Sequence, residues 1–166
     1  MHVESISLGG VSAERLMLKR HVNKTDLPNY ALLHFHGGVF VAGSLRTHRA
    51  LGSEIAARSG ATVFMLDYRL APEHQYPAAF DDCLAAYQAL LAKGYLPEQI
   101  VLGGDSAGGA LVLALLVALR DRNIPLPAAT IMISPFVDMT LCGNSFEKNK
   151  MRDPMLTKEI LQRGAD

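Results

Sequence analysis

The 166-residue sequence predicts an α/β protein with a doubly wound, mostly parallel sheet. Short apolar segments alternate with longer segments whose apolar residues recur every three or four positions, which is typical of strands followed by helices. Two Gly-rich stretches, 36–38 and 103–109, directly follow predicted strands. Because parallel strands joined by helices end at one edge of the sheet, we expect these stretches to lie close together.

The first two predicted strands form an antiparallel pair at the edge of the sheet. Residues 3–8 and 14–22 alternate apolar and polar side chains, as half-exposed strands do. Gly9 and Gly10 lie between them and predict a tight turn. Residues 23–29 are polar and contain a proline, which predicts a loop.

The later elements alternate between strand and helix. Gly60 and Gly94 stand where two predicted helices end, and Pro77 stands where the second one begins. Residues 141–153 are polar and irregular. The predicted strands are 30–35, 62–66, 100–102 and 130–133, and the predicted helices are 47–59, 77–92, 110–119 and the short 156–162.

Composition and charge exclude several classes of protein. Hydrophobic residues make up 49% of the sequence and charged residues 19%, which indicates a globular domain rather than a disordered chain. Lys plus Arg and Asp plus Glu both number 16, so nothing favours binding to nucleic acid or to an acidic membrane. Cys83 and Cys142 match neither a metal site nor a disulfide framework, so we expect no metal and two free thiols.

The sequence also carries no targeting signal that we can identify. The N-terminus lacks the basic region and apolar core of a signal peptide. The longest apolar run, 110–119, is shorter than the about 20 residues that cross a bilayer. We therefore expect a cytoplasmic protein without membrane contact.

Ser106 stands at the apex of a predicted strand–turn–helix with the pattern Gly-x-Ser-x-Gly. A serine hydroxyl is a weak nucleophile unless a base takes its proton, and this sharp turn lifts it clear of the backbone. Gly104 and Gly108 leave room for the strand and helix to approach each other. The N–H of Ala107 then lies at a helix N-terminus, where it can bind a developing oxyanion. The alternative is a Gly-rich turn with an incidental serine.

A second Gly-rich turn follows the predicted strand 30–35. Gly37 and Gly38 allow backbone N–H groups to face a ligand without obstruction, and together with the Ala107 N–H they would form an oxyanion hole. The alternative is an ordinary Gly-Gly turn. We expect the Ser106 hydroxyl to lie near these amides, at the carboxyl ends of neighbouring parallel strands.

Jointly, these motifs resemble the hormone-sensitive-lipase family of α/β-hydrolase esterases. The resemblance rests on His36-Gly37-Gly38-Val39-Phe40, Asp67-Tyr68-Arg69-Leu70-Ala71-Pro72-Glu73-His74, Pro77-Ala78-Ala79, Gly104-Asp105-Ser106-Ala107-Gly108-Gly109 and Ser134-Pro135-Phe136-Val137-Asp138. It implies an eight-stranded α/β-hydrolase sheet, of which six strands are predicted here. It also implies hydrolysis of short-chain acyl esters through an acyl-enzyme intermediate, with no cofactor and with a small-molecule ester as the partner.

The resemblance assigns a role to each motif residue. Ser106 is the nucleophile, and His36 is a structural residue beside the oxyanion hole. Asp105 orients nearby backbone. The oxyanion donors are Gly37, Gly38, Ala107 and Val39, and Gly104 and Gly108 complete the elbow motif.

Val39 departs from the family pattern, which usually has a third glycine at this position. The amide donor survives the change, but a β-branched residue is strained if the position requires a positive φ. We also expect Asp67, Arg69 and Glu73 to form a buried polar network rather than a site.

A catalytic base is missing from the expected place. In α/β-hydrolases the chain order is Ser, acid, His, yet no histidine follows Ser106 in this sequence. Asp138 and Asp153 could serve as the acid, but a structural role is the preferred interpretation. We expect the acid and the histidine beyond Asp166, and a single domain over 1–166 that is truncated after its sixth strand.

Two further functions remain open, and so does association between copies of the chain. A relative that has lost its base could serve as a small-molecule receptor, and a lactone or amide hydrolase would share the same site. An unpaired strand 130–133 would expose an apolar edge that favours strand-edge association or homo-oligomers.

Overall fold

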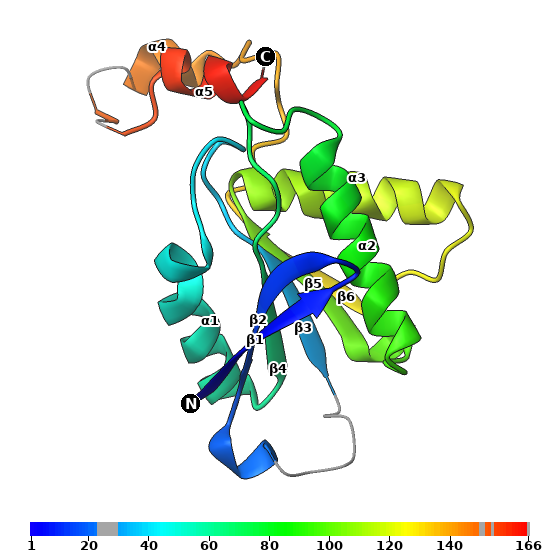
Figure 1. The fold of residues 1–166 in the computed structure, drawn as a ribbon. Coiled ribbons are helices and arrows are strands. Elements are labelled where there is room, and N and C mark those ends of the chain that lie inside the picture. Colours follow the sequence, from blue (N-terminus) through cyan, green and yellow to red (C-terminus); the bar gives the residue numbers. More distant parts are fainter. Residues whose placement is uncertain (23–29, 150–151, 154, 166) are drawn as a thin grey trace.

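Six strands form one sheet in the computed structural model, which describes residues 1–22, 30–149, 152–153 and 155–165 (Figure 1). The strand order is β1-β2-β4-β3-β5-β6. The strands are β1 (His2–Leu8), β2 (Val11–Met17), β3 (Ala31–Phe35), β4 (Thr62–Leu66), β5 (Ile100–Asp105) and β6 (Ala129–Ile133). The predicted polar loop 23–29 lies outside the described residues.

The predicted antiparallel pair at the sheet edge is confirmed, but its second strand is displaced. Gly9 and Gly10 have φ values of 59° and 90°, which suit a two-residue hairpin turn. β2 therefore starts at Val11 instead of residue 14. It ends at Met17, because Lys19–His21 form a short 3₁₀ helix, η1, where the alternating pattern predicted more strand.

The four remaining strands are parallel, and β3 lies between β4 and β5. Ala31 of β3 pairs with Thr62 of β4 on one side and with Ile100 of β5 on the other. At the other end of the strands, Phe35 pairs with Gly104. The turns that follow β3 and β5 are therefore neighbours at the same edge of the sheet, as the sequence predicts.

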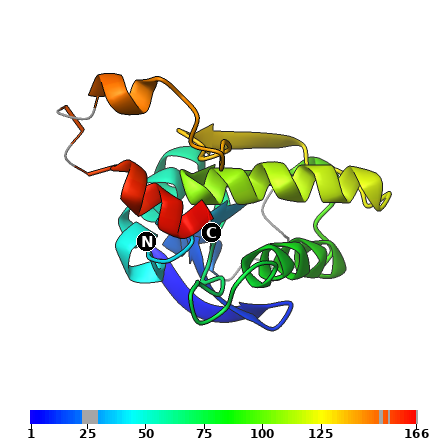
Figure 2. The same cartoon turned by 90° about the horizontal axis from the view of Figure 1, so that it is seen from above.

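Helices cover both faces of the sheet, which confirms the doubly wound fold (Figures 1 and 2). α1 (Leu45–Ser59) packs on β2 and β4, whereas α2 (Ala78–Ala92) and α3 (Ala107–Asp121) contact each other and cover the opposite face. Side chains alternate along the strands accordingly. Leu33 joins the large cluster under α2 and α3, while Leu32 joins the smaller cluster under α1.

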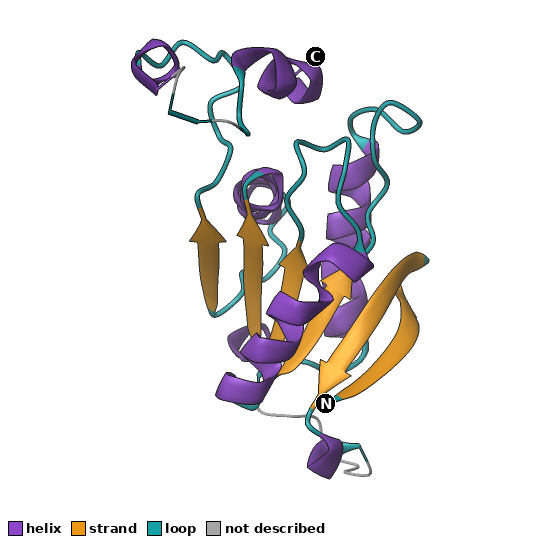
Figure 3. Cartoon of the chain, turned by 90° about the vertical axis from the view of Figure 1, so that its left-hand side faces the viewer, coloured by secondary structure: helices purple, strands orange, loops and turns teal. Residues whose placement is uncertain are grey.

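β6 ends the sheet with an exposed edge (Figure 3). Within the described residues it pairs with β5 alone. Ile131 remains 55% exposed, and Met132 and Ile133 are exposed as well. The expectation of an apolar, unpaired edge at this strand is confirmed.

The last described segment contains more helix than the sequence predicts. α4 (Ser145–Asn149) lies within the stretch predicted to be irregular, and α5 (Lys158–Ala165) replaces the predicted helix 156–162. α5 buries Leu161 against Val39 near the end of β3. Of the helices in the described part of the chain, none is long and apolar enough to cross a membrane.

Candidate active site

The elbow at Ser106 is tighter than the sequence predicts. β5 continues through Asp105 and α3 begins at Ala107, so Ser106 alone makes the turn. Its φ of 50° and ψ of −117° are strained for a non-glycine residue. Two backbone hydrogen bonds of 2.9 Å hold this conformation: Ser106 donates to the carbonyl of Ile133 and accepts from the N–H of Phe136.

Two glycines permit the close contact between β3, β5 and α3. A Cβ atom at Gly108 would overlap the Phe35 carbonyl of β3, and one at Gly104 would overlap the backbone of Gly108. Gly103 and Gly104 lie in the strand, and Gly108 and Gly109 lie in the helix. The glycines therefore serve packing rather than turn formation.

Asp105 ties the elbow to two other elements. Its carboxylate accepts hydrogen bonds from the Gly37 N–H at 3.1 Å and from His34 Nε2 at 3.2 Å. His48 Nε2, from α1, lies 3.4 Å from the same carboxylate. The backbone-orienting role expected for Asp105 thus involves the turn after β3.

The electrostatics favour an ionised Asp105. Burial raises the pKa of this carboxyl, but the hydrogen bond from His34, the charges of His48 and His34, and the Gly37 N–H together outweigh it. The net effect places the pKa below its ordinary value. His34 and His48 are thereby engaged with a carboxylate behind the elbow.

This hydrogen bond corrects the role predicted for Gly37. Its N–H is directed at Asp105, so it is not available to an oxyanion. In the described part of the chain, no acceptor is present for the N–H of Gly38 or of Val39. Ala107 is the first residue of α3, where N–H groups have no partner within the helix. The candidate donors are therefore Gly38, Val39 and Ala107.

Val39 has a positive φ, which is the condition under which the sequence predicts strain at this β-branched residue. Its φ is 55°, and that of Phe40 is 62°, so two non-glycine residues occupy the left-handed region in succession. The N–H groups of Val41 and Ala42 both donate to the Gly38 carbonyl and close the turn. Gly164 of α5 lies against Val39.

His36 stabilises the turn that follows β3. Its Nδ1 donates to the Gly37 carbonyl at 2.9 Å, and its ring stacks on Tyr68 and His48 at centroid distances of 4.3 and 5.3 Å. Its buried Nε2 has no partner within the described residues. Burial lowers the pKa of His36 and outweighs the opposing effect of the Gly37 hydrogen bond. A neutral, buried ring fits the expected structural role.

The other acidic residues make local contacts. Asp138 accepts from the N–H and hydroxyl of Thr140, and Asp153 accepts from the N–H groups of Met155 and Leu156. These hydrogen bonds lower the pKa of both carboxyls. Both aspartates thus stabilise turns, which agrees with the structural interpretation.

The predicted network of Asp67, Arg69 and Glu73 is wrong. Arg69 instead pairs with the buried Asp82 of α2, at 2.7 Å, while Asp67 and Glu73 are exposed. No local pattern predicts this pairing, because the two residues meet through the packing of α2. Among the described residues, no group of three His, Cys, Asp or Glu side chains is arranged to hold a metal ion.

The contacts of His34 and His48 with Asp105 were also missed. The register of β3 and β5 places His34 beside Gly103, which precedes Asp105 by two residues. From there the His34 side chain reaches the Asp105 carboxylate. A histidine in a strand that ends at a Gly-Gly turn was the available signal. The position of His48 depends on how α1 packs, for which the sequence holds no local signal.

Comparison with known proteins agrees with the geometry. A family model described as an alpha/beta hydrolase fold matches residues 32–166. The sequence is 41% identical over 164 residues to an esterase of Acinetobacter venetianus, covering 99% of this chain and 52% of that protein. It is 40% identical over 161 residues to an acetyl-hydrolase of Streptomyces hygroscopicus, covering 97% and 52%.

A solved structure has the same fold. The crystal structure of an esterase from the bacterial hormone-sensitive lipase (HSL) family matches with a TM-score of 0.90 and 46% identity, over 99% of this chain and 54% of that one. These matches confirm the resemblance drawn from the motifs. The chain spans about half the length of the curated relatives it matches.

Proposed function

The chain belongs to the alpha/beta hydrolase fold family, and on this premise we propose that the whole protein is a serine carboxylesterase of the hormone-sensitive-lipase type that hydrolyses short-chain acyl esters. The observation that carries the proposal is the one-residue elbow. It holds Ser106 at φ 50° beside the Gly-rich turn that follows β3. The names of the relatives, an esterase and an acetyl-hydrolase, support the same activity.

The proposed reaction uses a proton transfer and an oxyanion site. Ser106 Oγ forms a bond to the acyl carbon as a base takes its proton, and the carbonyl oxygen gains negative charge. The N–H groups of Gly38, Val39 and Ala107 stabilise that charge. Collapse of the tetrahedral species breaks the ester bond, the alcohol leaves with the proton, and water then releases the acid. These steps need no cofactor.

The proposal assigns the general base to a residue outside 1–166. No histidine follows Ser106 in the sequence. Of those that precede it, His34 and His48 are engaged with Asp105, and His36 donates to the Gly37 carbonyl. None of these three is thereby presented to Ser106 as a base.

A second candidate is a receptor that binds a small molecule without turning it over, because no histidine follows Ser106 within residues 1–166. Such a protein would retain the oxyanion donors and lose only the base. Ester, lactone and amide substrates are therefore compared in one assay, with binding measured alongside turnover.

The test is Ser106→Ala in the full-length protein. Loss of the nucleophile of a catalytic triad lowers turnover by about 10⁶-fold, so hydrolysis of p-nitrophenyl acetate falls to background while the circular dichroism spectrum is unchanged. Ser5→Ala is the matched control, because Ser5 is exposed on β1. A Ser106→Ala variant that retains more than a few per cent of the wild-type rate would refute the proposal. Wild-type protein that binds but never hydrolyses would favour the receptor.

A further inference from the structure

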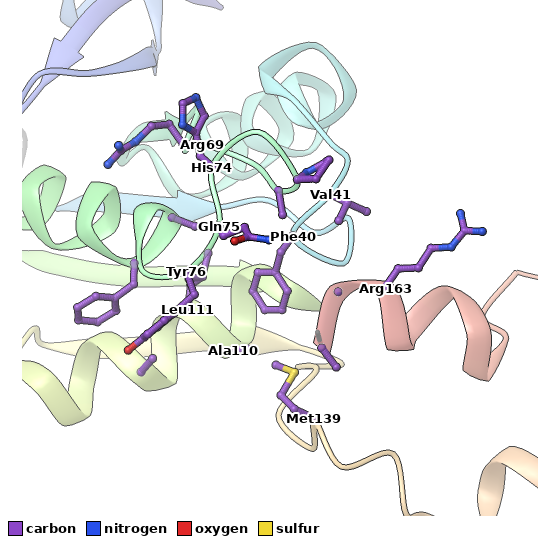
Figure 4. Close-up of a pocket in the computed structure, with 17 residues that line it drawn as sticks. Phe40, Val41, Arg69, His74, Gln75, Tyr76, Ala110, Leu111, Met139 and Arg163 are labelled. Carbon is purple, nitrogen blue, oxygen red and sulfur yellow. The ribbon is translucent and has the colours of Figure 1, made fainter.

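The turn after β3, which carries two of the candidate oxyanion donors, borders open space on one side. Phe40 and Val41 line a cavity of about 520 Å³, together with the loop 69–76, the first turns of α2 and α3, and the end of α5 (Figure 4). Packing on that side therefore fixes the turn only in part. Its position depends also on contacts with α1, on the opposite face of the sheet, and His48 makes the main one.

His48 connects the first turn of α1 to the carboxylate that holds the turn. Its Nε2 lies 3.4 Å from Oδ2 of Asp105, and the Gly37 N–H donates to that same oxygen at 3.1 Å. The other oxygen, Oδ1, lies 3.2 Å from His34 Nε2. Each oxygen of the carboxylate therefore faces one histidine. His48 is the one that shares its oxygen with Gly37.

The second ring nitrogen of His48 faces a hydroxyl group. Nδ1 lies 2.8 Å from Thr47 Oγ1, which accepts a hydrogen bond from the Ser44 N–H at 3.0 Å. If the Thr47 hydroxyl donates to Nδ1, the hydrogen of a neutral imidazole is on Nε2 and points at Asp105. If the hydroxyl donates instead to the Ser44 carbonyl, 2.9 Å away, Nδ1 carries a hydrogen and the imidazolium is the form that donates at Nε2. A carboxylate acceptor favours an N–H at Nε2 in both arrangements.

Stacking fixes the plane of the His48 ring. The ring lies 5.3 Å from that of His36, with an interplanar angle of 29°, and His36 stacks in turn on Tyr68. The Tyr68 hydroxyl donates to the His36 carbonyl at 2.6 Å. His48 thus contacts the turn in two ways, through the Asp105 oxygen that binds Gly37 and through the His36 ring.

We propose that His48 is a positioning residue, which holds the Asp105 carboxylate so that the Gly37 N–H stays bound to it and the N–H groups of Gly38 and Val39 stay available to an oxyanion. The inference rests on the proposed esterase function and assigns His48 no contact with the substrate. Oxyanion donors act most strongly on the charge that develops in the transition state. Displacement of the turn should therefore lower kcat and leave KM nearly unchanged.

The first test compares four variants of the full-length protein with p-nitrophenyl acetate as substrate. Removal of one oxyanion donor lowers kcat about 10²–10³-fold, and displacement of donors costs less, so we expect kcat to fall at least tenfold in His48→Leu, with KM within twofold of wild type. The amide nitrogen of glutamine can replace Nε2, so His48→Gln should restore kcat to within threefold of wild type. The shorter amide of His48→Asn matches Nδ1 alone and should behave like leucine. Arg46→Leu, at an exposed position on the same helix, is the matched control and should leave kcat unchanged.

Two results of this test would overturn the inference. One is a loss of kcat in His48→Leu that is smaller than tenfold. The other is an equal loss in His48→Gln, which would assign to the ring a purely structural role.

The second test measures the turn itself and does not depend on catalysis. Amide hydrogen exchange is followed by NMR in the full-length protein labelled with ¹⁵N-glycine. We expect the Gly37 amide to exchange at least tenfold faster in His48→Leu and His48→Asn than in wild type, His48→Gln or Arg46→Leu. The Gly60 amide, which donates to the Ala56 carbonyl at the other end of α1, is the internal control for a general loss of stability.

Equal exchange of the Gly37 amide in wild type and His48→Leu would overturn the inference, as would equal acceleration at Gly60. If wild-type protein hydrolyses no ester, the proposed function fails. The exchange of the Gly37 amide then still decides whether His48 positions the turn.

Discussion

Asp105 connects three elements through one carboxylate. It is the last residue of β5 and precedes Ser106, accepts a hydrogen bond from the turn after β3, and faces His48 of α1. Its side chain is 24% exposed, so the charge is largely shielded from solvent. An ionised carboxylate at this position orders the turn that presents Gly38 and Val39, which makes Asp105 a positioning residue in our interpretation.

We expect Asp105→Asn to destabilise the chain and to change its response to acid. Hydrogen bonds to a charged group contribute about 1.5–3 kcal/mol, and the variant loses part of that at pH 7. Because the pKa of Asp105 is lowered by folding, its contribution is complete above the unfolded pKa of about 3.9 and is lost as pH falls through the folded pKa. Urea unfolding at a series of pH values measures both effects.

The control for this comparison is Asp81→Asn, an exposed carboxyl on α2. Its unfolding curve should follow wild type at each pH. If Asp105→Asn matched wild type at pH 7 and in acid, the carboxylate would have no positioning role.

His36 gives a second pH dependence, in a higher window. Its pKa is lowered chiefly by burial, so the unfolded chain binds a proton more readily than the folded one. Stability is therefore complete above the unfolded pKa of about 6.5 and falls as pH drops from there toward the folded pKa. We expect His36→Phe to abolish this loss and to cost about 0.5–1.5 kcal/mol at pH 8 through the hydrogen bond to Gly37.

The measurement is the urea midpoint between pH 8 and pH 5. His74→Phe serves as the control, because His74 is exposed and should leave the wild-type slope unchanged. A slope in His36→Phe equal to that of wild type would assign the pH dependence to other groups.

At the scale of elements, α3 packs closely against β3 because Gly108 has no side chain at the point of contact. A Cβ at Gly108 would overlap the Phe35 carbonyl, a backbone atom in the middle of the sheet that cannot move alone. The same approach places the N-terminus of α3, and with it the Ala107 N–H, beside the turn after β3. The geometry of the site and the packing of the core therefore depend on one contact.

We expect Gly108→Ala to lower the free energy of unfolding by about 3 kcal/mol or more, because the helix must move away from the sheet. Thermal and urea unfolding of the purified chain measure the loss. Gly143→Ala is the control, since its Cβ would meet nothing closer than 3.5 Å. Comparable stability of the two variants would show that β3 and α3 adjust to a methyl group without cost.

At the scale of the whole molecule, the two edges of the sheet differ. The β1–β2 hairpin closes one edge with strands of alternating polarity, whereas β6 leaves apolar side chains and backbone groups exposed at the other. Such an edge pairs readily with another strand. The net charge of zero adds no repulsion between copies.

We therefore propose that the 166-residue chain on its own associates through β6, and we expect a concentration-dependent sedimentation coefficient. Ile131→Lys places a charge on this edge and should shift the chain toward monomer. Val117→Lys is the matched control, because Val117 is also an exposed aliphatic residue but lies on α3. A wild-type chain that stays monomeric at every concentration would contradict this expectation. Full ester hydrolysis by the chain alone would contradict the separate assignment of the general base to a residue outside 1–166.

The local signals in the sequence determined most of the elements. The strand 62–66 and the helix end at Gly60 agree with the structure, because burial periodicity and a left-handed glycine are properties of a few consecutive residues. The predicted strand boundaries near residues 14 and 103 were misplaced, because they depend on contacts between segments that are distant in the sequence. Whether a glycine continues a strand or begins a turn depends on what packs against it, and at Gly104 that partner is Gly108 of α3.

The sequence by itself determined the fold class, the nucleophile candidate and the presence of a Gly-rich turn beside it, because each depends on residue types in a short, ordered pattern. Only the tertiary structure decided which amides remain free. His34 and Asp105 are 71 positions apart and Gly37 and Asp105 are 68 apart, and the register of β3 against β5 brings them into contact. In that register the Gly37 N–H donates to Asp105, and the N–H groups of Gly38 and Val39 remain without an acceptor in the described part of the chain. This outcome depends on strand pairing, so no single segment of the chain predicts it.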